Sequence, residues 1–564
     1  ANVMDPARIS PIAQKIMALV PLPNVPGGGL SSNYTGVTHF IRKTNSFDVK
    51  ADQNLRGEDH LSVRYSWQKV DQDQQALFGL AGGPSHDGAH GTQTAYNTAA
   101  NYTHVFSPVL LTEVRLGLNH YKNIAKQHDY GSDASAAIGI PGVNVDPSTS
   151  GLTGIDIAGF SSPIVGTGAS YPWVRGETNI DLVNNWTKIQ GNHSLKFGAE
   201  VRRVRDDLQQ GQVFGQRGIF RYRDGQTGLK GGPKTGQAND FASFLLDIPN
   251  QVGRDVGVQD ASWRESQVFA YAQDTWQANS KLTLTYGLRW ELYVPPTPRR
   301  AGDYSNYDPI TNTLIIAGLG KNPMDLGMKT RFTYFAPRLG VAYRLDDKTV
   351  VRAGYGMSYE SYPDNLNTYA TNYPLKQNNS FDSLSSYTQA QEPDGTPASM
   401  AAGFPAPLLA PIPPDGIIHD APPQAYNVIN LNWKAPYVQS WNAAVQRALP
   451  AGFVLDVAYV GNVGVGLAQN YNLNAGFVAG AGAKGQPEYT AFGRTASSTV
   501  FKQAGSSYHS LQVKLDHRFT NGLSATSAYT YQKGMGYSTS SGSGVGGTSI
   551  YLDFSRNYSR LSND

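Results

Sequence analysis

Apolar and polar residues alternate along the stretch 282–292, LTLTYGLRWEL. Every second residue from Leu282 to Leu292 is apolar, and the residues between them are Thr, Gly, Arg or Glu. A period of two predicts a β-strand with one apolar face and one polar face. The apolar face contacts either a protein core or lipid, and the pattern along the rest of the chain decides between these environments.

The same alternation occurs in six other stretches, and each of the seven comes directly after a short turn. The other stretches are 61–67, 114–118, 195–201, 351–359, 453–459 and 523–531. The turns are 56–59, 107–110, 190–193, 278–281, 345–348, 449–452 and 520–522. These turns contain Gly, Asn, Asp and Pro, which hairpin turns favour. We therefore predict seven antiparallel hairpins, with two strands each and about 14 strands in all.

Long connections separate the hairpins, and most of them are polar and rich in Gly, Pro, Ser and Asn. They cover roughly 69–92, 123–177, 207–261, 294–331, 361–434, 467–505 and 535–548. Short turns at one end of the strands and long loops at the other are typical of a transmembrane β-barrel. A soluble multi-domain β protein with the same stripe in its core is the alternative. Its strands would average only about 5–6 residues, whereas a membrane-spanning strand needs about 9–11.

Composition supports a β-rich chain with polar loops. The 564 residues include 60 Gly and 32 Tyr, and only 16% are charged. The net charge of +3 gives no support for a nucleic-acid partner. Cysteine is absent, which excludes disulfides and thiolate metal sites. The chain contains no uncharged apolar run of about 18 residues, so we expect no membrane-spanning helix. We expect a short amphipathic helix over roughly 6–19, ended by Pro21 and Pro23.

Two sets of side chains are candidates for function in a barrel. The polar strand face lines the lumen, where its charges contact a plug or a passing substrate, or are simply solvated. This set contains Arg64, Lys196, Glu200, Arg202, Arg289, Glu291 and Arg352. Aromatic residues near strand ends are candidates for a belt at the membrane interfaces, namely Trp67, Tyr121, Trp186, Trp276, Trp290 and Tyr359. We find no catalytic motif and no metal-ligand spacing, and we expect no enzyme activity, metal or cofactor.

The stretch 264–296 closely resembles a hairpin motif of TonB-dependent outer-membrane receptors. The matching residues include Gln273, Asp274, Trp276, Gly287 and Arg289. The stretches 334–360 and 191–203 resemble neighbouring hairpins of that family. Within the family, the chain resembles the Oar-like subgroup, because 5–24 resembles the segment after the plug there and 239–251 resembles a loop motif.

The resemblance implies an all-β, antiparallel outer-membrane barrel of about 22 strands with a plugged lumen. About 14–16 of these strands fall in this chain. We expect 1–30 to be a post-plug linker with a short helix and 31–564 to be a partial barrel. The plug, the TonB box and the C-terminal strands are expected outside this sequence.

The implied function is energised passage of a bulky ligand across the bacterial outer membrane. The implied partners are outer-membrane lipid, the TonB complex through the plug, and an extracellular ligand. A passive porin-like channel and a surface adhesion or assembly protein remain alternatives. The sequence does not identify the ligand.

Overall fold

The computed structural model describes residues 3–30, 32–83, 88–166, 168–211, 213–231, 236–362, 372–476, 478, 480–520, 522–536 and 559–560. The last predicted connection, 535–548, therefore lies almost wholly outside the described residues.

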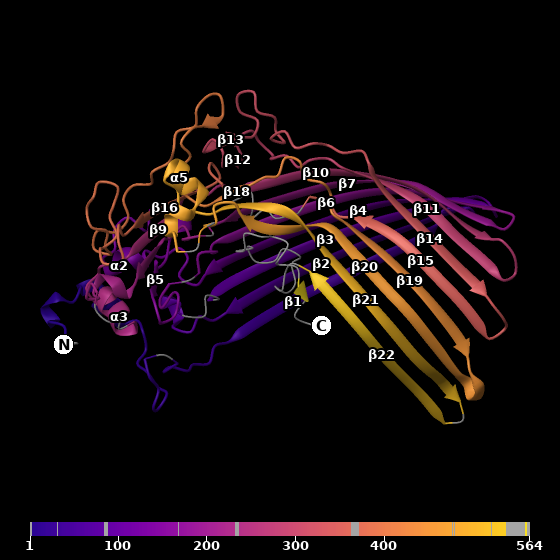
Figure 1. The fold of residues 1–564 in the computed structure, drawn as a ribbon, viewed down its shortest axis with the longest axis horizontal. Coiled ribbons are helices and arrows are strands. Elements are labelled where there is room, and N and C mark those ends of the chain that lie inside the picture. The colour runs from indigo at the N-terminus through magenta and orange to yellow at the C-terminus, as the bar shows by residue number, and fades with distance from the viewer. Residues whose placement is uncertain are drawn as a thin grey trace.

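One 16-stranded sheet dominates the structure (Figure 1). Its long strands pair antiparallel in chain order. They are β1 (Phe40–Asn54), β2 (Asp59–Gln74), β3 (Ala89–Ser107), β4 (Leu110–Gln127), β6 (Trp173–Gln190), β7 (His193–Gln210), β10 (Ala261–Gln277), β11 (Leu282–Tyr293), β14 (Tyr334–Arg344), β15 (Thr349–Tyr359), β19 (Tyr437–Ala448), β20 (Phe453–Asn472), β21 (Ser498–Thr520) and β22 (Leu523–Gly536). Two short strands complete the sheet, β18 (Tyr426–Val428) beside β21 and β23 (Ser559–Arg560) beside β22.

The predicted hairpins are confirmed, because each predicted turn joins two strands that pair in the structure. The partners are β1–β2, β3–β4, β6–β7, β10–β11, β14–β15, β19–β20 and β21–β22. All seven turns lie at one end of the sheet, and the long connections lie at the other (Figure 1). The first strand starts at Phe40, nine residues later than the predicted start of the barrel at residue 31.

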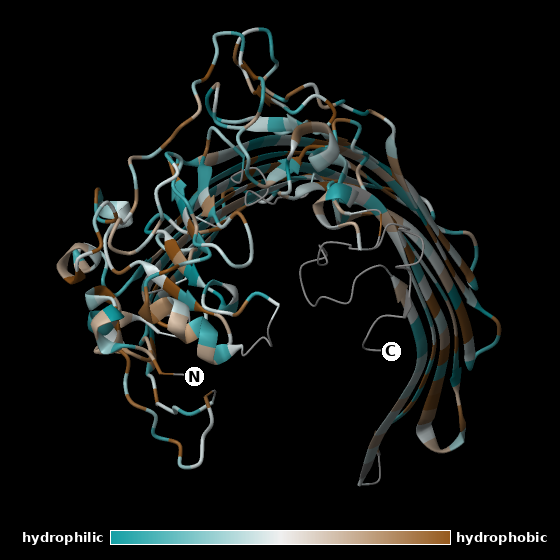
Figure 2. Ribbon diagram, turned by 60° about the vertical axis from the view of Figure 1, so that its left-hand side comes forward, coloured by the Kyte–Doolittle hydropathy of each residue, from teal (hydrophilic) through white to brown (hydrophobic). Residues whose placement is uncertain are grey.

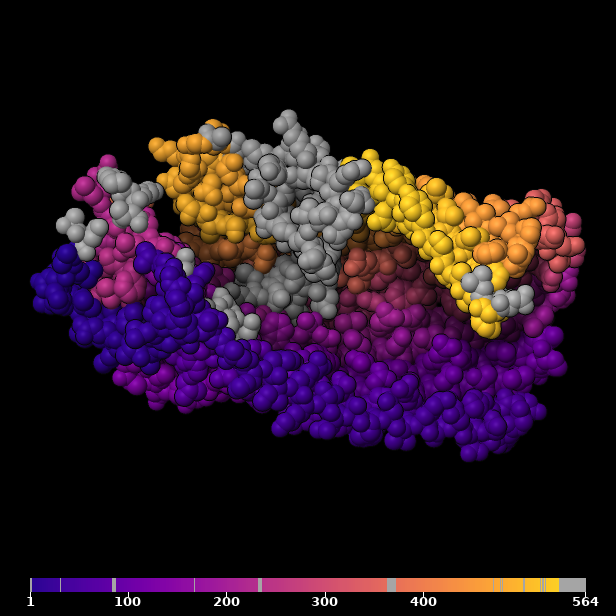
Figure 3. All heavy atoms as spheres, turned by 90° about the horizontal axis from the view of Figure 1, so that it is seen from below, coloured from indigo at the N-terminus to yellow at the C-terminus, as the bar shows by residue number. Residues whose placement is uncertain are grey.

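The two faces of the sheet differ in polarity, as alternation requires. Large apolar side chains such as Leu116, Leu182 and Phe197 are exposed on one face. We call this the outer face. The inner face is the concave one, where connections pack against Phe269 and Tyr293. Figure 2 shows the sheet curving through an arc with its two ends apart, and Figure 3 shows the hollow between the β1 edge and the β22 edge.

The apolar part of the outer face has a defined height. Polar or charged residues lie at each border of the outer face, ten positions apart along a strand. The border pairs are Asp59 and Lys69 in β2, His193 and Arg203 in β7, and Asp274 and Arg264 in β10. Ten residues at about 3.3 Å each, tilted by about 40°, span about 25 Å along the barrel axis. This is the height of the apolar band of outer-membrane barrels.

The long connections fold into a cap rather than remaining irregular. A four-stranded sheet has the order β16-β9-β8-β5, and a three-stranded sheet has the order β12-β13-β17. Their bounds are Gly154–Ile157 (β5), Ile219–Tyr222 (β8), Gln251–Val256 (β9), Ser305–Asp308 (β12), Thr313–Ile316 (β13), Gln377–Asp382 (β16) and Ile417–Ile418 (β17). The helices are α1 (Pro11–Met17), α2 (Ala134–Ile138), α3 (Gln237–Leu245) and α5 (Pro487–Phe492). No helix among the described residues is both long enough and apolar enough to cross a bilayer.

The predicted N-terminal helix is present as α1, and it belongs to this cap. Ser10 caps it through a hydrogen bond from the Ala13 amide. Its Ile12 and Ile16 are buried in one apolar cluster with residues of α3, β5, β8 and β9. The N-terminal segment therefore lies at the long-connection end of the strands (Figure 1).

A glycine bulge bends β20 toward the cap. The pairing register with β21 shifts between Val465 and Leu467, which leaves Gly466 as the extra residue. Gly466 has a φ of +73°, a left-handed conformation that suits glycine. Such a bulge increases local twist and bends the strand. Beyond it, β21 pairs with β18, a strand of the connection between β15 and β19.

Candidate functional site: the charged inner wall

Four of the seven predicted lumen residues form one ion-pair network. Register places them side by side, because Phe269 of β10 is paired with Glu200 of β7 and with Glu291 of β11. Arg289 lies between the two carboxylates, with N–O distances of 3.1 Å to Glu200 and 2.9 Å to Glu291. Arg202 donates to the second oxygen of Glu200 at 2.7 Å. We call Glu200, Arg202, Arg289 and Glu291 the inner-wall network.

The network is partly shielded from water. The side chain of Glu291 is 8% exposed and that of Arg289 is 21% exposed. The guanidinium of Arg289 lies 4.3 Å from the ring centroid of Phe269, a cation–π distance. Low local dielectric strengthens ion pairs and raises the cost of leaving one member alone. The network is therefore a fixed and partly desolvated group of charges on the inner face.

Two neighbours extend the network, and sequence reasoning missed both. Tyr293 donates its hydroxyl to Glu291 at 2.6 Å. Asp181 of β6 lies 3.9 Å from Arg202. The alternation of apolar and polar residues around Asp181 could have placed it on the polar face of its strand. Nothing in the sequence predicts the contact of Tyr293, because that contact depends on tertiary packing at the end of its strand.

Glycines of the motif hairpin and of its neighbour make room for Tyr271 and Gln273 on the same face. A Cβ on Gly198 would lie 3.0 Å from the Tyr271 ring and 2.9 Å from Asn185, and a Cβ on Gly287 would lie 2.9 Å from Gln273. The Tyr271 hydroxyl donates to Asn185 at 2.8 Å. Gly287 of the predicted motif thus has a steric reason to be glycine.

The other three predicted lumen residues lie on the inner face but apart from the network. Arg64 pairs with Asp48 at 3.0 Å, and both side chains are more than half exposed. Arg352 donates to Gln446 at 3.2 Å. Lys196 alternates with Leu195 and Phe197 and so shares the face of Glu200.

Three of the predicted belt aromatics lie near borders of the apolar band. Trp186 and Trp276 lie on the outer face near the short turns. Trp67 lies on the outer face at the opposite border, two positions before Lys69, and it stacks on Phe47.

The remaining three belt aromatics differ in their surroundings. Trp290 donates its indole N–H to the carbonyl of Phe332 at 2.8 Å. Tyr121 occupies an odd position of β4 and shares the inner face with Asn119, and its register partner in β6 is Glu177. Tyr359 packs on Tyr334 below the cap, with ring centroids 5.0 Å apart. A strand-end aromatic can point to either face, and its place in a belt at the membrane interface stays a prediction.

The five motif residues divide between the two faces. Gln273, Gly287 and Arg289 lie on the inner face. Asp274 and Trp276 lie on the outer face, because they alternate with Gln273 along β10. Asp274 accepts hydrogen bonds there from His193 and from Tyr286.

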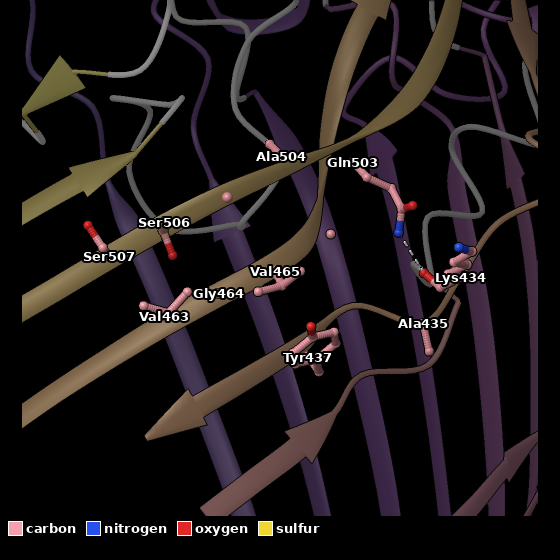
Figure 4. A pocket seen from close by; sticks show the side chains of 12 residues that line it. Lys434, Ala435, Tyr437, Val463, Gly464, Val465, Gln503, Ala504, Ser506 and Ser507 are labelled. Atoms are coloured by element: carbon pink, nitrogen blue, oxygen red, sulfur yellow. Dashed lines mark hydrogen bonds between the residues drawn. The ribbon is translucent and has the colours of Figure 1, made fainter. Parts of the chain in front are cut away.

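Two of the cavities on the sheet adjoin the features described above. One of about 470 Å³ lies on the inner face beside the network, and its lining includes Asp181, Arg202 and Glu265. The other, of about 690 Å³, lies at the bulge of β20 (Figure 4). Gln503 crosses its edge and donates to the carbonyl of Lys434 at 3.0 Å. Charged side chains contribute to the lining of the first cavity, whereas Gly, Ala and Val make up much of the lining of the second.

The cap contains buried charges that hold its segments together. Arg494 lies 4.9 Å from the rings of both Tyr307 and Tyr426, and it pairs with Glu488 at 3.3 Å. In α3, burial and the neighbouring carboxylate of Asp224 raise the pKa of Asp240 to about 6. No group of three or more His, Asp or Glu side chains among the described residues is arranged to hold a metal ion.

A protein-family model agrees with this architecture. The model of a family described as the outer membrane beta barrel domain matches residues 1–564. The chain is similar to solved structures of the outer membrane transporter YddB from Escherichia coli (8% identity, TM-score 0.48), the alcaligin outer membrane receptor FauA from Bordetella pertussis (10%, 0.41) and the ferripyoverdine receptor of Pseudomonas aeruginosa (12%, 0.45).

The matched regions cover 89%, 87% and 88% of this chain and 49%, 53% and 50% of those chains, respectively. The chain thus spans about half the length of these proteins. No curated protein sequence matches it. Because the family model covers the whole sequence, the chain belongs to the outer membrane beta barrel family, and it lies in the outer membrane of a bacterium.

Proposed function

We propose that the chain forms the wall and the extracellular cap of a TonB-dependent transporter, which moves a bulky ligand across the outer membrane with energy from the inner membrane. The inner-wall network carries this proposal. Its Arg289 belongs to the hairpin that resembles the receptor motif, and it is held between Glu200 and Glu291 on the concave face. Fixed and partly desolvated charges on a lumen wall suit contact with a folded plug.

In this proposal the plug fills the lumen and bears on the inner-wall network. The TonB complex pulls on the plug from the periplasmic side, and movement of the plug breaks its polar contacts with the wall. The cap forms the outer vestibule and binds the ligand there. The Oar-like assignment and the division into a post-plug linker at 1–30 and a barrel at 31–564 belong to the same proposal.

Conductance and TonB binding together test the proposal. The full-length protein, inserted in a planar bilayer, is expected to show no steady ion conductance, because a plug closes the lumen. It is also expected to bind the periplasmic domain of TonB. Steady ohmic conductance without TonB binding would instead support a passive porin. A closed protein that does not bind TonB would support an adhesion or assembly role.

A double substitution tests whether the inner-wall network contacts the plug. Arg289→Gln with Glu200→Gln removes the central ion pair while keeping a polar, uncharged side chain at both positions. If the plug bears on the network, this variant leaks ions in the bilayer assay. Arg64→Gln is the matched control, because Arg64 lies on the same face in an exposed ion pair. Equal leak from both variants would argue against a specific plug contact.

A further inference from the structure

Two clusters of Asp, His and Tyr side chains lie on the outer face, at one border of its apolar band. In the first cluster, Asp59 of β2 meets Tyr102 and His104 of β3. The Tyr102 hydroxyl donates to Asp59 Oδ1 at 2.6 Å, and His104 Nδ1 lies 2.6 Å from the same oxygen. The His104 ring packs edge-on against Phe106, with ring centroids 4.3 Å apart.

The second cluster repeats this chemistry on other strands. Asp274 of β10 lies between His193 of β7 and Tyr286 of β11. His193 Nδ1 lies 2.6 Å from Asp274 Oδ2, and the Tyr286 hydroxyl donates to that oxygen at 2.7 Å. The His193 ring stacks on Trp276 at 5.4 Å with an interplanar angle of 6°. In both clusters a single carboxylate oxygen accepts both hydrogen bonds.

Both clusters lie at the same border of the membrane. Asp59, His193 and Asp274 each mark the short-turn border of the apolar band, about 25 Å below the charged border near the cap. The short turns of such barrels lie in the periplasm. The clusters therefore lie at the level of the headgroups of the periplasmic leaflet.

The hydrogen bonds leave one ring nitrogen of each histidine for an external partner. Nδ1 of His104 and of His193 is used by the carboxylate, and no hydrogen bond to Nε2 of either ring occurs among the described residues. The His104 side chain is 28% exposed and that of His193 is 39% exposed. A protonated ring held by a carboxylate at Nδ1 presents Nε2–H as a charged donor, and a phosphate is the complementary acceptor.

We propose that each cluster binds the phosphate of one phospholipid in the periplasmic leaflet. Nε2–H of His104 or His193 donates to the phosphate oxygen. Asp59 or Asp274 holds the imidazole ring in place, and Phe106 or Trp276 packs against that ring. One lipid is bound at β2 and β3 and the other at β7, β10 and β11, and together they set how deep the sheet lies in the membrane. This inference depends on the outer-membrane location and is independent of TonB.

Lipid titration of the purified protein tests the proposal. The protein is extracted from outer membranes, stripped of lipid in detergent, and titrated with phosphatidylethanolamine under native mass spectrometry. The double variant His104→Gln and His193→Gln is expected to weaken lipid binding by at least about tenfold, because each site loses a charge-assisted donor. His120→Gln is the matched control. His120 lies on the same face at the opposite border, where it bonds to Thr178.

Two competitors identify the chemistry. Diacylglycerol with the same acyl chains lacks the phosphate and is expected to compete poorly, and inorganic phosphate lacks the acyl chains and is also expected to compete poorly. The proposal is overturned if the double variant binds phosphatidylethanolamine like the wild type, if His120→Gln loses as much affinity, or if either competitor displaces the lipid as well as the phospholipid itself does.

A second measurement needs no variant, and so it does not depend on whether the double variant folds. Phosphatidylethanolamine with a photoreactive group in its headgroup is mixed with the wild-type protein and irradiated. Crosslinks are expected to concentrate in peptides that contain 59–63, 102–106, 193–197 and 274–286. Uniform labelling around the whole short-turn border would contradict the proposal.

Discussion

A single arginine on the outer face should destabilise the protein far more than the same arginine one position along the strand. Leu182 of β6 is 49% exposed and has Leu116 and Val201 as its register partners. The next residue, Val183, lies on the inner face, where its register partners are Arg115 and Glu200. Leu182→Arg and Val183→Arg are therefore a matched pair of apolar-to-arginine substitutions.

The depth of Leu182 determines the size of the effect. Leu182 lies six residues above Lys188 on the same face of β6. Six residues of a strand tilted by about 40° rise about 15 Å, which is near the middle of the band. Arginine facing lipid at that depth costs about 2–4 kcal/mol. Arginine at position 183 lies on the polar inner face beside Glu200, with which it can form an ion pair, and its expected cost is below about 1 kcal/mol.

Unfolding in lipid vesicles measures this difference. Each variant is folded into vesicles and titrated with guanidinium chloride, and the tryptophan fluorescence gives the free energy of unfolding. The predicted gap between the two variants is at least about 2 kcal/mol, with Leu182→Arg the less stable. Equal losses, or a larger loss for Val183→Arg, would refute the assignment of the faces.

Three further predictions follow from the network, the cap and the motif hairpin. A double-mutant cycle of Arg289→Met with Glu200→Gln should give a coupling of about 1–2 kcal/mol, since the pair is only partly buried; additive losses would show that the pair contributes nothing. Because the pKa of Asp240 is raised to about 6, its protonated form is favoured by folding, so the stability of the cap should fall as pH rises from about 4 to about 6. Asp240→Asn should remove that dependence and slow hydrogen exchange in α3 at pH 7, and an unchanged pH slope would contradict the burial argument. Gly198→Val should clash with the Asn184 carbonyl and the Tyr271 ring and cost about 1–3 kcal/mol by overpacking, measured as a lower unfolding midpoint than that of Gly176→Val, where a Cβ would meet no atom within 4 Å.

The hairpins could be predicted from the sequence because both of their signals are local. Two-residue alternation from Leu282 to Leu292 and the turn before it determine the strand, its faces and its partner. The polar face of each strand could be predicted for the same reason. The identity of the ion-pair partners could not be predicted. Arg289 reaches Glu200 across β10, 89 residues away in sequence, and single-strand patterns contain no information about that register.

The fold of the cap could not be predicted from local sequence patterns, because segments far apart in the sequence form it. Its largest apolar cluster joins Ile16, Phe244 and Phe404, which come from three separate parts of the chain. Polar, Gly- and Pro-rich connections predict irregular loops when they are read one at a time. Their few apolar residues suffice for a core only when the connections converge at one end of the sheet.

The alternation of lipid and lumen along one strand is the central claim, and the absence of cysteine makes it directly measurable. Single cysteines are introduced in turn at positions 195–202 of β7 in cells, and each is treated with a water-soluble, membrane-impermeant thiol reagent and with a lipid-soluble one. Positions 196, 200 and 202 are predicted to react with the water-soluble reagent, and positions 195, 197, 199 and 201 only with the lipid-soluble reagent. Gly198 is left unchanged, because a Cβ there would clash with the Asn184 carbonyl. Reactivity without a period of two, or with the two sets exchanged, would contradict the account.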